Sequence, residues 1–273
     1  MALNLMYITN DPKIAAIADK AKVDRVWIDL ERLYKKERQS GMNTVKSHHT
    51  LEDIPKIKRV LKHSKLQVRI NPINPDSKAE IDKAIEYGAE ILMLPFFKSV
   101  DEVKAFLEFV DGRAVTNLLL ETKEAVEVLD EILDLSGIDE IHIGLNDLHL
   151  SYGLKFMFQL ISDGTVETLC KKIGKKGIPY GFGGIAKIGE GYVPAEHILA
   201  EHYRLKSSAA ILSRSFYDTV DQNDYTAIEK FFIDGIKEIR EYEKMLESKP
   251  EEFFIQNHKT VCKEVENIIS SMY

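Results

Sequence analysis

The stretch that decides the fold reads VTNLLLETKEAVEVLDEILDLSGIDEIHIGLNDLHLSYG, residues 115–153. Residues 115–120 and 138–143 are runs rich in branched apolar side chains, which is typical of buried strands. Between them, residues 123–135 carry apolar side chains at helical spacing. Two parallel strands joined by a crossover helix end on the same side of their sheet. The stretch therefore predicts one strand–helix–strand unit of a parallel α/β fold.

The same alternation continues on both sides of this unit. Further strands are expected at residues 1–8, 23–30, 66–70, 90–94, 178–181 and 208–212, and further helices at 12–21, 51–61, 78–87, 100–110, 164–175 and 194–205. Eight strands that alternate with helices favour closure into a (β/α)8 TIM barrel, which typically takes about 250 residues. In that fold the catalytic residues lie at the carboxyl ends of the strands.

The C-terminal part of the chain does not follow this alternation. Residues 1–218 are expected to form the barrel, and residues 219–273 a C-terminal extension. Residues 225–246 and 252–269 each show helical spacing with no strand after them, so they predict a helical hairpin. Its apolar face must be buried, and the sequence leaves open whether the barrel or a neighbouring subunit covers it.

Composition narrows the class of protein. The chain has 273 residues, of which 44% are hydrophobic and 30% charged, as in an ordinary globular protein. No apolar run approaches the roughly 20 residues that span a bilayer, and the N-terminus resembles a first strand rather than a leader, so a cytoplasmic location is expected. The two cysteines favour neither a disulfide framework nor a thiolate metal site. A net charge of −7 with scattered basic residues argues against nucleic acid as the main partner.

Two acids follow the strands of the opening stretch. Glu121 comes directly after residues 115–120, and Asp147 lies shortly after residues 138–143. In a barrel both strand ends face one cleft, so the two carboxylates are expected to reach one metal ion. A single acid at a strand end is otherwise most often a helix cap or a solvated loop residue.

Five motifs occur in the order and spacing of one known family. They are WIDLER at 27–32, RINP at 69–72, GAEILMLPFF at 88–97, LLLETKEAVEVLDEI at 118–132 and IHIGLNDLHLSYG at 141–153. With them the chain resembles the HpcH/HpaI-type aldolase and citrate lyase β-subunit family. The resemblance implies a (β/α)8 barrel, a homo-oligomer (trimer or hexamer), and carbon–carbon lyase or aldol reactions assisted by Mg²⁺ or Mn²⁺.

The resemblance also assigns roles to residues. It implies that Glu121 and Asp147 bind the metal and that Arg69 binds and polarises the substrate. Cleavage of a bond β to a carbonyl leaves an enolate, so a cation must stabilise the oxygen on which negative charge grows. Backbone N–H groups of the turn that contains Gly144, Asn146 and Asp147 are expected to receive the carboxylate of a small anionic substrate.

The chain departs from the family at one catalytic position. The aldolase branch has a histidine directly after Glu31, where this chain has Arg32, and the citrate lyase-like branch has an acid there. Arginine cannot act as a base near neutral pH. The candidate bases are therefore His48 or His49, in the loop of residues 33–50, or a water bound to the metal. Arg32 itself is suited to binding a phosphate or carboxylate of the substrate.

Other readings stay open for some of these residues. Arg69 has a structural alternative as the ion-pair partner of Asp29 or Glu31. The glycine-rich residues 181–191 can hold a phosphate or form a tight structural loop. His142, which alternates with two isoleucines, is expected to face the helix layer. His197 and His202 are expected to be packed or solvated.

The sequence thus favours a metal-dependent carbon–carbon lyase or aldolase that acts through the enolate of a small 2-oxo acid. A lyase for a CoA thioester, of the citrate lyase β-subunit type, is the nearest alternative. A ligand-binding or assembly subunit without turnover is an alternative of another class, motivated by Arg32.

Overall fold

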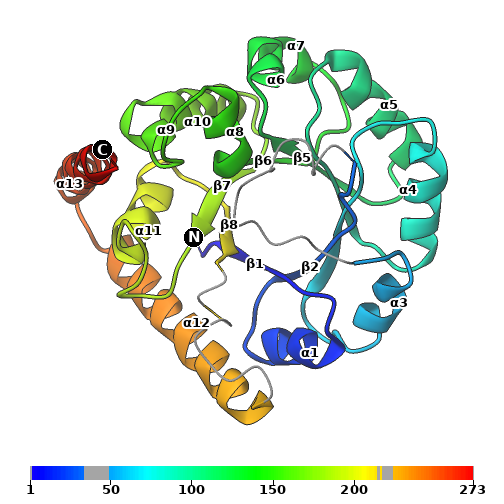
Figure 1. The fold of residues 1–273 in the computed structure, drawn as a ribbon, viewed down its shortest axis with the longest axis horizontal. Helices are drawn as coiled ribbons and strands as arrows, with labels where there is room; N and C mark the ends of the chain where they lie inside the picture. Colours follow the sequence, from blue (N-terminus) through cyan, green and yellow to red (C-terminus); the bar gives the residue numbers. More distant parts are fainter. Residues whose placement is uncertain (1, 34–48, 214–215, 217–223, 273) are drawn as a thin grey trace.

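A computed structural model describes residues 2–33, 49–213, 216 and 224–272 of the chain. Eight parallel strands close into a barrel in sequence order, with the last strand paired to the first (Figure 1). The strands are β1 (Asn4–Ile8), β2 (Arg25–Asp29), β3 (Lys65–Arg69), β4 (Ile91–Leu94), β5 (Val115–Leu120), β6 (Glu140–Ile143), β7 (Tyr180–Ile185) and β8 (Ala209–Leu212). The predicted (β/α)8 architecture is confirmed.

Helices surround the barrel as an outer ring (Figure 1). They are α1 (Pro12–Lys20), α3 (Asp53–Lys58), α4 (Ser77–Glu86), α5 (Val100–Val110), α6 (Lys123–Glu127), α7 (Leu129–Ile132), α8 (Leu145–Ser151), α9 (Gln159–Ser162), α10 (Thr165–Lys175), α11 (Ala195–Arg204), α12 (Tyr225–Glu247) and α13 (Glu251–Ser271). The helix predicted at 123–135 is divided into α6 and α7, because the backbone leaves helical geometry at Val128, with φ −104° and ψ 14°.

Strand β7 is longer than the sequence predicted, and its glycines explain why. A Cβ on Gly181 would lie 2.4 Å from the carbonyl oxygen of Ala209 on β8. Glycine therefore permits a close approach of the two strands that no other residue allows. The pairing of Gly184 with Ile211 then extends β7 beyond residue 181.

The barrel interior has an apolar layer above a polar one. Trp27, Met93 and Leu119 form the apolar cluster, with Ile8 and Ile211 packed against it. Closer to the amino ends of the strands, the buried Arg25 forms an ion pair with Glu140 and donates to Gln67, and Asn117 also donates to Glu140. The apolar layer forms the floor beneath the carboxyl ends of the strands, where the site residues lie.

The C-terminal helices pack on their own barrel. Helix α12 contacts α1 and α11, and α13 contacts α11 and α9. In Figure 1, α12 lies lengthwise along the outside of the ring and α13 is seen almost end-on. The buried Glu243 of α12 accepts the backbone N–H of Leu3 at 2.7 Å, and Arg240 donates to Asp24 at 2.7 Å. The apolar faces predicted for this extension are therefore covered at least in part within the same chain.

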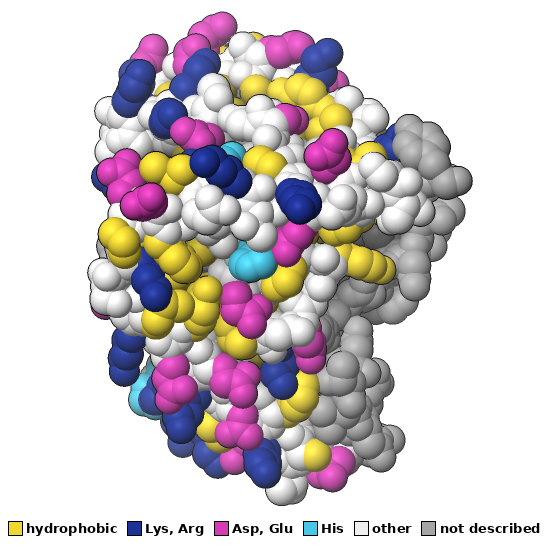
Figure 2. All heavy atoms as spheres, turned by 90° about the vertical axis from the view of Figure 1, so that its left-hand side faces the viewer, with side chains coloured by type: hydrophobic (Ala, Val, Ile, Leu, Met, Phe, Trp, Pro, Cys, Tyr) yellow, Lys and Arg dark blue, Asp and Glu magenta, His cyan; other side chains and the backbone are white. Residues whose placement is uncertain are grey.

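The surface on the side that carries α13 has no single type of side chain in excess. Acidic, basic and hydrophobic side chains are interspersed there (Figure 2). None of the helices within the described ranges combines the length and apolar character needed to cross a membrane.

Candidate active site

Arg69 and Asp29 form an ion pair at the carboxyl ends of two neighbouring strands. The register of β2 and β3 places the two residues directly opposite each other. Arg69 donates from Nε to Asp29 Oδ1 and from Nη2 to Oδ2, each at 2.8 Å. The Trp27 ring lies 5.1 Å from the centre of the guanidinium. Two parallel hydrogen bonds fix the plane of the guanidinium, so Arg69 is held rigidly in the barrel mouth.

Two further carboxylates act on Arg69. Glu31 Oε2 lies 3.4 Å from Arg69 Nη2, and both Glu31 and Glu121 are buried. Burial lowers the pKa of Arg69, but the negative charges of Asp29, Glu31 and Glu121 outweigh it and raise the pKa above its usual value. One guanidinium thus faces three carboxylates.

Glu121 is held by backbone groups on both sides. It follows β5, and its Oε1 accepts the N–H of Phe96 at 3.0 Å. Phe96 adopts φ +50°, which is unusual for a residue with a side chain and turns its N–H toward this carboxylate. A Cβ on Gly144 would lie 2.8 Å from Glu121 Oε2. The space beside Oε2 therefore exists because residue 144 is glycine.

Asp147 lies in the first turn of α8, immediately after β6. Strand β6 pairs with β5, and Gly144 N donates to Leu120 O at 2.9 Å. The two predicted metal ligands thus follow neighbouring strands on the same side of the barrel. Asp147 is half-buried and Asn146 is exposed.

The donor set fits a divalent cation in an open site. Among the described residues, no group of three or more His, Cys, Asp or Glu side chains is arranged to enclose a metal ion. Mg²⁺ and Mn²⁺ accept carboxylate oxygens, and Mg²⁺ is commonly bound by one or two carboxylates with the remaining positions left to water and substrate. Glu121 and Asp147, which follow neighbouring strands, are carboxylates of the kind that such a site uses.

Arg32 contacts His49 and Asn71. Its Nη2 donates to the carbonyl oxygen of His49 at 2.7 Å, and its backbone N–H donates to Asn71 Oδ1 at 2.9 Å. Asn71 in turn donates from Nδ2 to Glu80 at 2.7 Å. Burial raises the pKa of the Glu80 carboxyl. Arg32 therefore links His49 to the residues that follow β3, in addition to any contact with a substrate.

His49 is buried beside Asp29, and its ring is oriented. The backbone N–H of Asp29 donates to His49 Nδ1 at 2.9 Å. A neutral ring that accepts at Nδ1 carries its hydrogen on Nε2, so His49 is a donor in this arrangement. That orientation does not suit a base unless the ring changes tautomer. His48, the other histidine considered as a base, lies outside the described residues.

Sequence reasoning missed the supporting residues Asn71, Glu80 and Phe96. Asn71 stands inside the RINP motif two residues after Arg69, and this position was a signal that could have been used. No local pattern marks Glu80 or the N–H of Phe96, because both reach the site only through packing.

His142 and His202 are both buried. His142 pairs in register with Leu119, which belongs to the barrel interior, so the expectation that His142 faces the helix layer is wrong. Residues that pair in register on neighbouring strands point to the same side of the sheet, so His142 points inward as Leu119 does. His202 is buried and its ring stacks on Phe182 at 3.9 Å, as expected of a packed residue.

The glycine-rich loop after β7 uses one of its N–H groups internally. Gly189 N donates to Glu196 Oε1 at 3.0 Å, in the first turn of α11. The chain's own carboxylate thus occupies this donor, which favours the reading of a structural loop over a phosphate site.

Comparisons with known proteins agree with this geometry. The sequence profile described as HpcH/HpaI aldolase/citrate lyase matches residues 4–157, more than half of the chain. The chain therefore belongs to the HpcH/HpaI aldolase/citrate lyase family. The match contains every predicted site residue, from Glu31 to Asp147. No curated protein sequence gives a significant match.

Solved structures show the same fold at low sequence identity. The HpcH/HpaI aldolase from Desulfitobacterium hafniense DCB-2 is 17% identical, with a TM-score of 0.59 over 88% of this chain and 93% of that one. Macrophomate synthase is 14% identical, with a TM-score of 0.56 over 77% and 78%. The citrate synthase SbnG is 15% identical, with a TM-score of 0.58 over 78% and 85%. At such identities these structures support the fold alone.

Proposed function

We propose that this protein is a divalent-metal-dependent carbon–carbon lyase or aldolase that acts through the enolate of a small 2-oxo acid. One observation carries the proposal: Arg69, the buried Glu121 and the half-buried Asp147 lie at the carboxyl ends of the strands, in a chain of the aldolase and citrate lyase family. Carboxylates in this position can hold a cation to which an anionic substrate binds.

Each site residue has a defined part in this proposal. Glu121 and Asp147 would hold Mg²⁺ or Mn²⁺. The bound metal supplies positive charge that stabilises an oxygen on which negative charge develops. Arg69 uses Nε and Nη2 for Asp29, so its Nη1 group is the part of the fork that would meet the substrate oxygen. Asp29 is a positioning residue, because it fixes the guanidinium without contacting the substrate.

The proton-transfer group differs from that of the aldolase branch. Arg32 is not suited to act as a base and binds the carbonyl oxygen of His49, and His49 presents Nε2–H rather than a lone pair. Glu31 remains close to Arg69 and is buried, so it contributes negative charge that keeps the guanidinium in place. We therefore infer that a water molecule accepts the substrate proton, with His49 as a hydrogen-bond donor in the mouth.

The proposal also covers the substrate class, the cellular location and the oligomeric state. A small anionic substrate follows from the arginine and the cation, a cytoplasmic location from the sequence, and a homo-oligomer from the family resemblance. The CoA-thioester lyase and the non-catalytic binding subunit are the outcomes that remain if the central test fails.

The test is exchange of the methyl protons of pyruvate with deuterated water, followed by NMR. Exchange should require Mn²⁺ or Mg²⁺, and Glu121→Gln should lower its rate about 10²–10³-fold, the usual cost of losing one electrostatic stabiliser. Glu127→Gln is the matched control, because Glu127 is exposed on α6 and pairs only weakly with Lys123, at 3.9 Å.

Either outcome is informative. Metal-dependent exchange that Glu121→Gln abolishes and Glu127→Gln preserves supports enolate chemistry, and a screen of aldehydes would follow. Absence of exchange with both metals in folded protein would overturn the proposal, and turnover of a CoA thioester would then be measured.

A further inference from the structure

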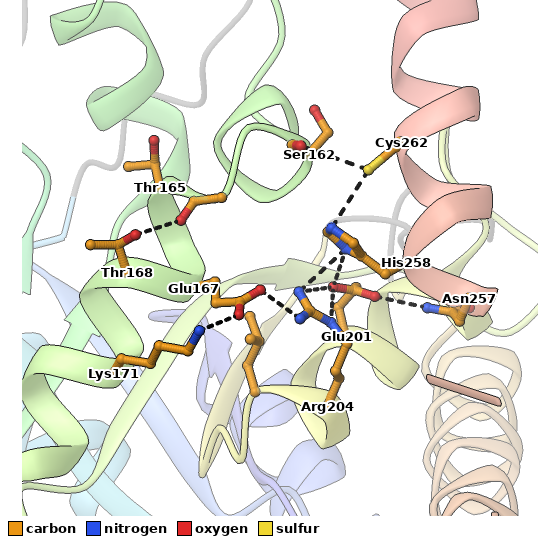
Figure 3. A network of polar contacts seen from close by, with 12 residues as sticks. Ser162, Thr165, Glu167, Thr168, Lys171, Glu201, Arg204, Asn257, His258 and Cys262 are labelled. Carbon is orange, nitrogen blue, oxygen red and sulfur yellow. Dashed lines mark hydrogen bonds and ion pairs between the residues drawn. The ribbon is translucent and has the colours of Figure 1, made fainter. Parts of the chain in front are cut away.

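A second polar network lies far from the barrel mouth, where α13 packs against α9 and α11. Figure 3 shows Glu201 at its centre. Glu201 is fully buried and accepts hydrogen bonds from Arg204 Nε at 2.9 Å and Asn257 Nδ2 at 3.1 Å. His258 Nδ1 lies 3.0 Å from Glu201 Oε2. The carboxylate thus orients an imidazole that projects from α13.

His258 connects this carboxylate to a cysteine. Cys262 follows one turn later on α13, and its Sγ lies 3.6 Å from His258 Nε2 (Figure 3). Its second contact is the carbonyl oxygen of Ser162, at 3.7 Å. Cysteine, histidine and carboxylate therefore stand in the order nucleophile, base and orienting group.

The tautomer of His258 follows from its neighbours. Arg204 Nη2 also lies near Nδ1, at 3.3 Å, but Arg204 already donates to Glu201 and Glu167. The carboxylate is the closer partner of Nδ1, and it can only accept a hydrogen bond. A neutral His258 therefore carries its hydrogen on Nδ1. Nε2 is left with a lone pair that faces the Cys262 thiol.

The thiol is reachable from a cleft. Cys262 is half-buried and lines a cleft of about 360 Å³ together with Leu154, Ser162, Val265 and Ile269. One water molecule takes about 30 Å³ of liquid, so the cleft has room for a small organic group. It has no room for a folded protein partner.

We propose that Cys262 is a thiol–disulfide exchange site for small-molecule disulfides, with His258 as its base. The Cys262 Sγ attacks one sulfur of the disulfide, and the S–S bond of the small molecule breaks. The proton of the thiol moves to His258 Nε2 and then to the departing thiolate. The products are a mixed disulfide on Cys262 and one small thiol, so the step needs no other oxidant or reductant.

The second cysteine serves as an internal reference. Cys170, in α10, is buried, and burial raises the pKa of its thiol to about 12. Burial also raises the pKa of the Cys262 thiol. Both sulfurs are therefore protonated near neutral pH, and a base beside Cys262 is what would distinguish them.

The test exposes the folded full-length protein to 2-hydroxyethyl disulfide and follows adducts by mass spectrometry with peptide mapping. We expect one adduct, on Cys262, formed at least about tenfold faster than any on Cys170, since general bases typically contribute more than this. His258→Gln should slow the reaction about tenfold or more, whereas Lys259→Gln, an exposed neighbour on α13, should not.

A pH profile of the wild type tests the base without relying on a variant that folds. With His258 as base, the labelling rate should rise with pH and then level off while the Cys262 thiol is still protonated. A rate that increases in proportion to hydroxide up to pH 9 would overturn the proposal, because the thiol would then ionise without help. Equal labelling of the two cysteines in folded protein would overturn it as well.

Discussion

The barrel mouth and the network between α11 and α13 are both built around an arginine, but the carboxylates that it meets stand on different kinds of element. Arg204 faces Glu201 and Glu167, and Lys171 also binds Glu167, so two cations meet two carboxylates on helices. Arg69 faces Asp29 and Glu31, at the end of β2, and Glu121, which follows β5. The mouth thus gathers carboxylates at the carboxyl ends of the strands, which suits a place that receives a cation.

The two regions also differ in what holds their residues. Asp29 and Arg69 stand on adjacent strands whose register fixes the pair. Glu201, Arg204 and His258 stand on helices that meet only through packing. A change in the outer network should therefore lower stability, and a change in the mouth should lower activity.

The largest expected effect concerns two Glu→Gln variants. Glu201→Gln removes a fully buried carboxylate that Arg204 and Asn257 bind, and loss of one partner of a buried ion pair costs about 3 kcal/mol. The melting temperature should fall by roughly 6–12 °C for a chain of this size. Glu121→Gln keeps an oxygen that can accept the N–H of Phe96, so it should change stability by no more than about 1 kcal/mol.

Thermal unfolding with and without Mn²⁺ checks this comparison. A ligand present at 100 times its Kd stabilises the folded state by about 2.7 kcal/mol, so Mn²⁺ should raise the melting temperature of wild type and of Glu201→Gln. It should not raise that of Glu121→Gln. The comparison fails if Glu121→Gln is the less stable variant or still responds to the metal.

An intermediate effect is expected for Gly144→Ala. The added Cβ would lie 2.8 Å from Glu121 Oε2 and 2.9 Å from Glu121 Cβ, so the carboxylate must move. Such overpacking costs about 1–3 kcal/mol. Mn²⁺ affinity, measured by calorimetry, should weaken about tenfold or more, because a ligand carboxylate would be displaced. Gly144 has an ordinary φ of −81°, so the backbone itself tolerates alanine.

The control for this variant is Gly174→Ala, at the C-terminal end of α10. There a Cβ would come no closer than 3.3 Å, to the Tyr180 ring. We expect Mn²⁺ affinity to stay unchanged in the control. Wild-type affinity in Gly144→Ala would show that Glu121 is not a metal ligand, or that it moves without consequence.

The smallest effect concerns pH and two buried histidines. Burial lowers the pKa of His142 to about 4 and of His202 to about 3, from an ordinary value of 6.5. Between pH 6.5 and about 4 the unfolded chain therefore binds more protons than the folded chain. Stability should fall as the pH falls through this window, by at most about 1.4 kcal/mol per pH unit for each histidine.

Urea unfolding at several pH values measures that slope. His202→Phe, which keeps an aromatic ring against Phe182, should flatten part of the slope. His197→Gln is the control, because His197 is only partly buried and hydrogen-bonds to Glu264 on α13. An unchanged slope in His202→Phe would show that another group causes the acid sensitivity.

Much of the fold followed from the sequence because its signals are local. Strand-like apolar runs and helical spacing alternate along the chain, and each pattern persists whatever the element packs against. The ends of β3, β5 and β6 could be located in the same way. Arg69, Glu121 and Asp147 could therefore be placed on one side of the barrel from their positions in the chain.

The tertiary structure decided what the local signals could not. The register of β2 against β3 sets Asp29 onto Arg69, and β6 against β5 turns His142 inward. The bond from Asp29 N to His49 Nδ1 joins residues 20 positions apart and changes the role that His49 can take. The cover for α12 and α13 comes from α1, α9 and α11 of the same chain. Local sequence determines which elements form, whereas contacts between distant residues determine which side chains meet, because those depend on how all elements pack together.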